Sequence, residues 1–311
     1  MSQPGFKAFA PASLSNLGSG FDLLGLALEQ WGDYVIARKS MGAGVQVTGI
    51  SGASSGISKD VKKNTAGHVA SLMASAVGYK GGIELVIIKG YAHSSGLGSS
   101  AASAVASAIA VNALLGKPFK QKIDLLPFAL AGERVNDQLL PADNVAASLL
   151  GGIILSSPRD IHSPLSLPVP QGLMLTVLKP HLQTATIAER ARLDTKVLLQ
   201  GHVSQSDALA CLMHGLYQSN WSLISKGLKD YIIEPQRAPE IPFFYDIQNI
   251  AMENGALGCS ISGSGPSLFV VSNNSLVAEK AAKECIRPWS DGGIDCDTLV
   301  SKVNCRGAKL C

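Results

Sequence analysis

A glycine- and serine-rich loop in the middle of the chain carries the strongest chemical signal. It lies between a β-branched stretch and an uncharged helical stretch, and it reads Ser94-Ser95-Gly96-Leu97-Gly98-Ser99-Ser100-Ala101-Ala102. Glycines let backbone N–H groups approach a ligand closely, and the positive end of a helix dipole attracts anions. The loop is therefore suited to binding the phosphates of a nucleotide.

This loop differs from the common nucleotide-binding motifs. It lacks the lysine of G-x-x-x-x-G-K-[ST] and the acidic residue that reads a ribose in dinucleotide folds. Taken alone, it could also be an ordinary glycine turn with a serine N-cap. Two more glycine-rich turns favour a binding site, and they read Pro11-Ala12-Ser13-Leu14-Ser15-Asn16-Leu17-Gly18-Ser19-Gly20-Phe21-Asp22 and Cys259-Ser260-Ile261-Ser262-Gly263-Ser264-Gly265-Pro266-Ser267. If the three loops converge, they build a site between two lobes.

The elements expected around these loops alternate between strands and helices, which predicts an α+β fold with two lobes. The first half has strands at 6–12, 33–38, 83–89 and 153–156 and helices at 63–77, 99–115, 121–138 and 143–150. The second half has strands at 172–178, 257–261, 267–271 and 296–303 and helices within 183–227, 242–254 and 274–285. The proline-rich stretch 157–171 is the expected connection. We therefore divide the chain into an N-terminal lobe, 1–157, and a C-terminal lobe, 158–311.

Composition and charge exclude several classes of protein. Hydrophobic residues make up 46% of the chain, charged residues 16%, and the net charge is only +3. No basic stretch is interleaved with aromatics, so we expect no nucleic-acid partner. Residues 94–116 carry no charge, but their Ala, Ser and Val content with Asn112 favours a buried core helix over a membrane span.

The N-terminus and the cysteines indicate a cytoplasmic protein. The first residues lack the charged start and apolar run of a secretory signal. The six cysteines contain no C-x-x-C pair, so neither a metal site nor a disulfide framework is expected. We expect reduced and mostly buried thiols.

Taken together, the three loops resemble the diagnostic motifs of the GHMP kinases, in which the middle loop wraps the phosphates. Further segments are similar to the homoserine kinases within that superfamily, and they read Ala142-Asp143-Asn144-Val145-Ala146, Glu234-Pro235-Gln236-Arg237 and Gly255-Ala256-Leu257-Gly258. The resemblance runs from about residue 7 to the end. One position departs from it, because Pro141 stands where the family usually has a histidine that touches the substrate.

The resemblance implies a two-lobed GHMP kinase fold whose N-terminal lobe holds ATP and whose C-terminal lobe is a ferredoxin-like α/β sandwich. It implies transfer of the γ-phosphate of ATP to the hydroxyl of L-homoserine, a step of threonine biosynthesis. The residues implied in ATP binding are Ser94, Ser95, Gly96, Leu97, Gly98, Ser99, Ser100, Ala101 and Asn64.

Mg²⁺ would be held by Ser100 and Glu133, according to the same resemblance. Glu133 shares a helix face with Leu126, Ala129 and Leu130, where an acidic residue is unusual. A boundary glutamate reaching toward water is the alternative. A hard cation that bridges two phosphates needs only one or two protein oxygens.

For the substrate, the resemblance implies a set of contacts that includes an arginine for the carboxylate. The set is Asn16, Asp22, Asn144, Thr186, Arg190, Arg237 and Gly263. Arg192 is the alternative to Arg190, and a solvated helix arginine is the alternative for either. Asp22 would accept a hydrogen bond from the attacking hydroxyl, and Asp143 is either an alternative base or an N-cap. Phosphoryl transfer depends mostly on positioning, so a base is not required.

Two other functions remain open at this point. One is a GHMP kinase acting on a sugar, mevalonate or shikimate, although the paired arginines and the Asp-Asn-Val segment favour an amino acid. The other is a catalytically inactive ligand sensor, which the presence of Ser100 and Glu133 argues against. The sequence leaves the oligomeric state open, with a homodimer as one option.

Overall fold

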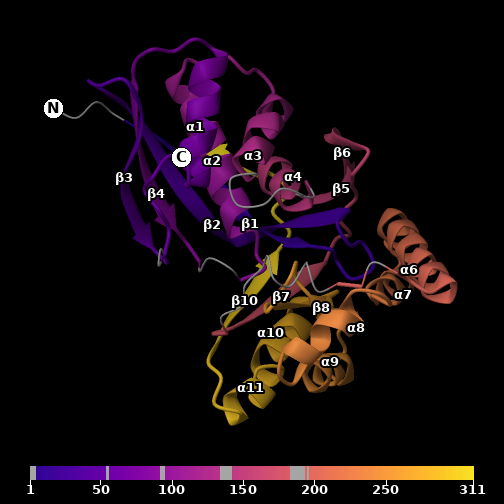
Figure 1. The fold of residues 1–311 in the computed structure, drawn as a ribbon. Helices are drawn as coiled ribbons and strands as arrows, with labels where there is room; N and C mark the ends of the chain where they lie inside the picture. The colour runs from indigo at the N-terminus through magenta and orange to yellow at the C-terminus, as the bar shows by residue number, and fades with distance from the viewer. Residues whose placement is uncertain (1–4, 54–55, 92–94, 134–141, 183–192, 195) are drawn as a thin grey trace.

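The chain folds into two lobes, one formed mainly by its first half and the other mainly by its second half (Figure 1). The computed structural model describes all residues except 1–4, 54–55, 92–94, 134–141, 183–192 and 195. Each lobe is a β-sheet packed against helices, which confirms the predicted α+β architecture.

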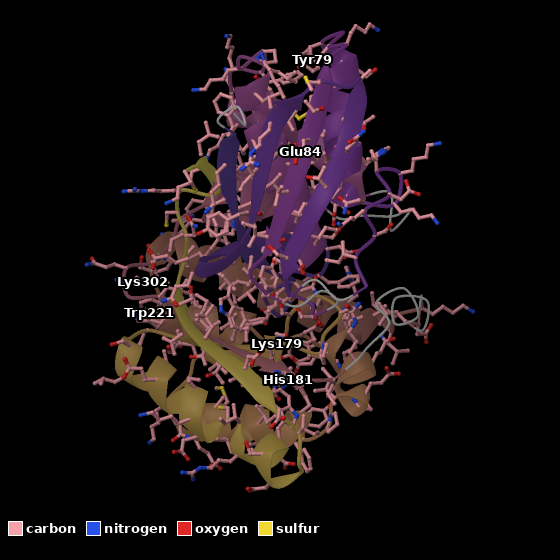
Figure 2. The ribbon with its side chains drawn as sticks, turned by 90° about the vertical axis from the view of Figure 1, so that its left-hand side faces the viewer. Tyr79, Glu84, Lys179, His181, Trp221 and Lys302 are labelled. Carbon is pink, nitrogen blue, oxygen red and sulfur yellow. The ribbon has the colours of Figure 1, made fainter. Side chains whose placement is uncertain are left out.

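The first lobe contains a sheet whose main path has the order β11-β1-β2-β4-β3. β3 runs parallel to β4, and the other pairs in this path are antiparallel. The strands on this path are β1 (Phe6–Ser15), β2 (Leu24–Ser40), β3 (Gly44–Gly52), β4 (Gly82–Lys89) and β11 (Lys309–Leu310). In Figure 2 these strands lie in front of the helices, with Glu84 of β4 on the sheet.

Three strands of this sheet were not predicted. β3 alternates only at Val45 and Val47 and contains three glycines, which weaken a strand signal, and β11 has only two residues. β6 (Asp160–Leu167) lies in the proline-rich stretch that we expected to be a connection, and it pairs antiparallel with β5 (Ile153–Ser157). β6 is paired only with β5, and such an edge strand accepts Pro164 because its outer side needs no N–H donor.

The strand pairing also bears on the division of the chain. β6 and β11 both follow residue 157, and both belong to the sheet of the first lobe. The end of the chain therefore lies in the first lobe, as the C label in Figure 1 shows. The boundary between residues 157 and 158 stays a prediction.

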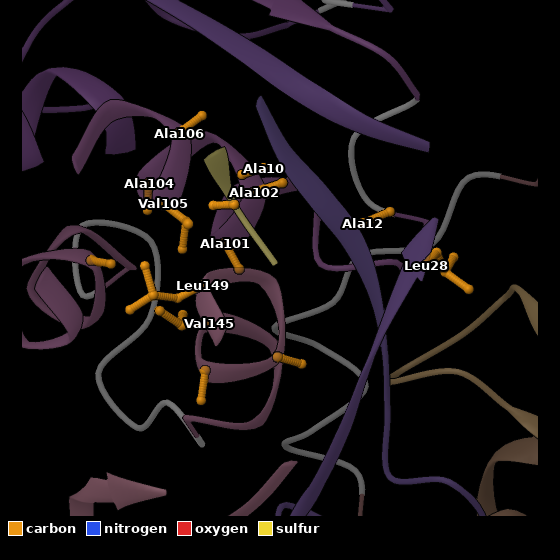
Figure 3. Packing of buried hydrophobic residues seen from close by; sticks show 14 of the residues in the cluster. Ala10, Ala12, Leu28, Ala101, Ala102, Ala104, Val105, Ala106, Val145 and Leu149 are labelled. Atoms are coloured by element: carbon orange, nitrogen blue, oxygen red, sulfur yellow. The ribbon is translucent and has the colours of Figure 1, made fainter. Parts of the chain in front are cut away.

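A helix of small residues forms the centre of the first lobe. α2 (Ser99–Leu114) is buried at every position except Ser100 and Asn112. It packs on β1 and β2 and on three helices, namely α1 (Thr65–Ala76), α3 (Leu126–Glu133) and α4 (Asp143–Leu150). Figure 3 shows its alanines close to side chains of β1 and α4. Small side chains allow this close packing, and the expectation of a buried core helix is confirmed.

The uncharged stretch 94–116 contains α2, which has 16 residues. Within the part of the chain that the structure describes, none of the helices combines the length and the apolar character that crossing a bilayer requires.

The second lobe has a four-stranded antiparallel sheet with the order β10-β7-β9-β8. Its strands are β7 (Met174–Pro180), β8 (Gly258–Ile261), β9 (Leu268–Ser272) and β10 (Cys296–Lys302). The helices α9 (Phe244–Glu253) and α10 (Ser275–Glu284) pack on this sheet. The order matches the predicted ferredoxin-like sandwich. Beside the β7–β10 pair, the side chains of Lys179 and His181 both contact the Asp297 carboxylate; Figure 2 labels Lys179 and His181.

Among the described residues of the second half, the other helices are α6 (Leu199–Gln218), α7 (Trp221–Gly227), α8 (Glu234–Arg237) and α11 (Arg287–Asp291). The described residues also contain two short 3-10 turns, η1 (Lys122–Leu125) before α3 in the first half and η2 (Ala238–Glu240) after α8 in the second. All six cysteines are free thiols. Only Cys259 and Cys285 are buried, so the expectation of mostly buried thiols was wrong.

Candidate active site

The three glycine-rich loops meet at the junction of the two lobes. The N–H of Ser13 in the first loop donates to Leu97 O in the middle loop, at 3.1 Å. Ser262 Oγ in the third loop donates to Gly96 O at 2.7 Å. Asn16 Nδ2 of the first loop donates to Gly263 O at 3.1 Å. Each loop therefore contacts both others, as their convergence requires.

Glycine is required at two of these contacts. Gly96 has φ +74°, and a Cβ there would lie 2.3 Å from Ser262 O and 2.9 Å from Gly265 O. Gly98 has φ +63°, and its Cβ would lie 2.2 Å from Ser13 Oγ. At both positions the backbone is left-handed and there is no room for a Cβ atom. Only glycine tolerates these two conditions together.

The middle loop ends at the start of α2, which is suited to binding an anion. The helix begins at Ser99, and its N-cap is Gly98, which offers no side chain to the first N–H groups. These groups have no partner within a helix, and the helix dipole adds positive potential at the same end. Ser94 lies outside the described residues.

A buried ion pair contacts both ends of the middle loop. Lys89 at the end of β4 pairs with Asp33 of β2, and its Nζ also donates to Ser99 O at 2.8 Å and to Ser103 Oγ at 2.9 Å. Asp33 Oδ1 accepts from the Gly90 N–H at 3.1 Å. Both ends of the loop are therefore fixed to one buried pair, which the sequence analysis missed.

The pKa values around this pair reflect burial. Burial lowers the pKa of Lys89, and the charge of Asp33 opposes that change. Burial raises the pKa of Tyr91, whose hydroxyl donates to Leu97 O at 3.1 Å. The carboxylate of Glu133 makes a small contribution in the upward direction to the pKa of both residues, although the pKa of Lys89 is lowered overall.

The sequence named two oxygen side chains for a magnesium ion, Ser100 near the start of α2 and Glu133 at the end of α3. Ser100 Oγ lies 3.0 Å from Thr65 Oγ1 of α1. Glu133 is half-buried on α3, next to a buried apolar face, as its spacing predicted. Hard oxygen donors beside an anion-binding helix start are what magnesium takes together with phosphate oxygens. The donor chemistry suits magnesium, and the role of Ser100 and Glu133 as its ligands stays a prediction.

Four of the residues predicted to bind the substrate are linked to one another by hydrogen bonds. Asn16 Oδ1 accepts from the Asp22 N–H at 3.2 Å, while its Nδ2 holds Gly263 O. Arg237 donates from Nη1 to the same oxygen, and its guanidinium lies 5.5 Å from the centre of the Phe21 ring. The structure therefore brings Asn16, Asp22, Gly263 and Arg237 together. Sequence reasoning gave Phe21 no role of its own.

Asn144 joins this group through the first loop. Its Oδ1 accepts from Ser13 Oγ at 2.8 Å, and its N–H donates to Asp143 Oδ1 at 2.7 Å. Asp143 is the first residue of α4 and is almost fully buried, and the N-cap position belongs to Ala142.

The remaining predicted residues divide into two groups. Asn64 is the N-cap of α1, because its Oδ1 accepts from the Gly67 N–H at 3.0 Å while its Nδ2 donates to Ser58 O at 2.8 Å. A contact between Asn64 and the nucleotide stays a prediction. The residues that lie outside the described part of the chain are Pro141, Thr186, Arg190 and Arg192.

Comparison with protein families gives two matches, one in each half of the chain. Residues 64–152 match the family described as GHMP kinases N terminal domain. Residues 212–291 match the family described as GHMP kinases C terminal.

Curated relatives match over nearly the whole chain. A homoserine kinase of Chlorobium phaeobacteroides (strain BS1) is 36% identical, with 97% of this chain and 98% of the relative covered. A homoserine kinase of Xylella fastidiosa (strain M12) is 37% identical, with 98% of this chain and 93% of the relative covered.

Solved structures agree with these sequence matches. The crystal structure of homoserine kinase from Cytophaga hutchinsonii has a TM-score of 0.96 and 39% identity, covering 99% of this chain and 98% of the other. A mevalonate kinase of L. major has a TM-score of 0.69 at 14% identity, covering 96% and 98%, and it shows the shared fold alone.

The close approach of the loops can be tested by adding one methyl group. Gly96→Ala and Gly116→Ala both place a side chain at positive φ, but nothing lies within 4 Å of a Cβ at Gly116. Both share a conformational cost of about 1–2 kcal/mol. Only Gly96→Ala places a methyl group against the third loop and forces the middle loop away from it. Compared with Gly116→Ala, it should therefore weaken binding of a non-hydrolysable ATP analogue by about tenfold or more. Calorimetric titration measures this, and equal affinities in the two variants would contradict the tight packing.

Proposed function

Because this chain belongs to the GHMP kinase family and, within it, to the homoserine kinases, we propose that it transfers the γ-phosphate of ATP to the side-chain hydroxyl of L-homoserine. The product is O-phospho-L-homoserine, an intermediate of threonine biosynthesis. The observation that carries the proposal is a chain of contacts from the middle loop to Arg237. Ser262 donates to Gly96 O of the middle loop, and the next residue, Gly263, accepts from both Asn16 and Arg237. The proposed ATP-phosphate site on the middle loop would then lie next to Arg237, the proposed partner of the amino-acid carboxylate.

The nucleotide side of the site uses backbone groups and two oxygen ligands. The triphosphate would lie on the middle loop and the first N–H groups of α2. Ser100 and Glu133 would hold magnesium, which neutralises charge on the β- and γ-phosphate oxygens when it is bound. Thr65 Oγ1 lies within hydrogen-bond distance of Ser100 Oγ and limits how that hydroxyl can turn.

The acceptor side of the site orients one amino acid. Arg237, together with Arg190, would bind the carboxylate, since a guanidinium can donate two parallel hydrogen bonds to the two carboxylate oxygens. Asn16, Asn144, Thr186 and Gly263 would hold the rest of the molecule. Asp22 would accept a hydrogen bond from the hydroxyl and aim it at the γ-phosphate. Its N–H is bound by Asn16, which supports a fixed position for this carboxylate.

We propose that the reaction proceeds without a strong base. Phosphoryl transfer passes through a loose transition state, so alignment and charge stabilisation supply most of the rate. Asp143 is the other candidate base. Its Oδ1 already accepts from the Asn144 N–H at 2.7 Å, which supports a role in presenting Asn144.

Cellular location and assembly complete the proposal. The enzyme is expected in the cytoplasm, where its nucleotide substrate is available, and a homodimer is the assembly to test. A sensor without activity is disfavoured because Ser100 and Glu133 are both retained.

The metal role of Glu133 can be tested with an isosteric change. Glu133→Gln keeps the shape of the side chain and removes the charge that holds the ion, so turnover should fall by about 10²-fold or more. Glu279→Gln, at an exposed position on α10, is the matched control. Calorimetric titration of Mg²⁺ into the enzyme with ADP provides a second readout. Unchanged magnesium affinity and turnover in Glu133→Gln would remove Glu133 from the site.

The carboxylate role of Arg237 predicts a selective loss of affinity. Arg237→Ala removes a charge-assisted contact of about 1.5–3 kcal/mol, so the KM for homoserine should rise by about 10- to 150-fold. The KM for ATP should change by less than about threefold, because the proposed phosphate contacts come from the middle loop and the start of α2 and not from Arg237. Arg287→Ala, on an exposed part of α11, is the control. Equal effects on both substrates, or better turnover of mevalonate than of homoserine, would contradict the assignment.

The two aspartates distinguish the two mechanisms. Asp22→Asn should lower turnover more than Asp143→Asn, because only Asp22 would contact the attacking hydroxyl. A general base contributes about 10²- to 10⁴-fold. A loss of that size in Asp143→Asn with normal homoserine binding, together with disappearance of an acid limb from the kcat profile, would show that Asp143 is the base.

A further inference from the structure

We infer that Glu234 is a positioning residue for the acceptor site: its carboxylate fastens α8 to β8 and thereby fixes Arg237 against the third loop. The inference rests on the proposed role of Arg237 in binding the substrate carboxylate. The resemblance that pointed to Arg237 gave Glu234 no function.

Glu234 is fixed to the strand that leads into the third loop. The residue is buried, with 7% of its surface exposed. One carboxylate oxygen accepts from Ser260 Oγ of β8, and the other accepts from Gln248 Nε2 of α9 at 3.1 Å. Gln248 Nε2 also donates to Cys259 O at 2.8 Å. Both carboxylate oxygens are therefore engaged, one by Ser260 in the β8 part of the third loop and the other by Gln248 of α9.

Arg237 makes the second connection between the same two segments. It is the last residue of α8, one helical turn after Glu234, and it donates to Gly263 O. The face of Phe21 packs on its guanidinium. α8 and the β8–third-loop segment are thus joined at two points, Glu234 to Ser260 and Arg237 to Gly263. If the first contact is lost, α8 can shift along β8 and carry the guanidinium with it.

The backbone of α8 is held independently of the Glu234 side chain. Asp230 Oδ1 accepts from the N–H groups of Ile232 and Ile233, both at 2.9 Å, and Asp230 Oδ2 accepts from the Glu234 N–H at 3.1 Å. The turn should therefore survive a substitution at Glu234. What such a substitution removes is the connection of the turn to β8.

The surroundings of Glu234 are specific for a carboxyl group. Burial raises the pKa of Glu234, while the hydrogen bonds from Ser260 and Gln248 lower it. An apolar side chain of similar size leaves those two donors without their acceptor, and a buried donor without a partner is unfavourable. Glutamine restores one acceptor oxygen, so it is the conservative replacement.

The test compares Glu234→Leu with Glu234→Gln in steady-state kinetics. Glu234→Leu should raise the KM for homoserine by about tenfold and leave the KM for ATP within about twofold. Glu234→Gln should recover part of that loss. Ser260→Ala, which removes a donor to the carboxylate, should raise the same KM by about threefold. Glu253→Gln, at an exposed position on α9, is the control and should behave as the wild type.

A double-mutant cycle separates positioning from general destabilisation. If Glu234 acts through Arg237, then Glu234→Leu should add less than about twofold to the homoserine KM once Arg237 is alanine. Additive effects would overturn the inference, and so would a rise of both KM values with a lower melting temperature. If Glu234→Leu does not fold, the cycle of Ser260→Ala with Arg237→Ala decides by the same criterion.

The same experiment separates this inference from the function on which it rests. If Arg237→Ala raises the homoserine KM and Glu234→Leu and Ser260→Ala do not, only the role of Glu234 is wrong. If Arg237→Ala leaves that KM unchanged, the proposed carboxylate site and the role of Glu234 are both wrong.

Discussion

The carbonyl oxygen of Gly263 is the point on which the arrangement of the site depends. It accepts from Asn16, which is 247 residues away in sequence, and from Arg237 at the end of α8. A carbonyl oxygen has two lone pairs, so one atom can join the first loop and the acceptor arginine to the third loop. The neighbouring Ser262 then binds the middle loop at Gly96. The nucleotide and acceptor halves of the site are thus held in one frame.

Each half of this frame is supported by a buried carboxylate. Asp33 holds Lys89, which fixes Ser99 and so the start of α2. Glu234 is held by Ser260 and Gln248 in the second lobe. Hydrogen bonds, and for Asp33 also the charge of Lys89, compensate these carboxyl groups for the water that they lose on burial. Such groups have few alternative positions, which makes them suitable for fixing loops that lack regular structure.

This construction suits a kinase of this family. The chemistry of phosphoryl transfer asks the protein for alignment and for stabilisation of charge more than for covalent steps. Backbone N–H groups at Gly98 and Ser99 cannot be reoriented by a rotamer change, in contrast to a lysine side chain. The small residues of α2 let the helix pack directly on β1 and β2, so its N-terminus is held by the core itself.

The sequence alone determined the features that depend on neighbouring residues. The middle loop, the buried helix after it and the acidic position at Glu133 follow from local spacing, and the resemblance in three loops identified the family. The tertiary structure decided what depends on distant partners. β6 and β11 become strands only because β5 and β1 offer them an edge. Lys89 and Glu234 gain their roles from Asp33 and Ser260, which lie 56 and 26 residues away, and no local pattern records such a pairing.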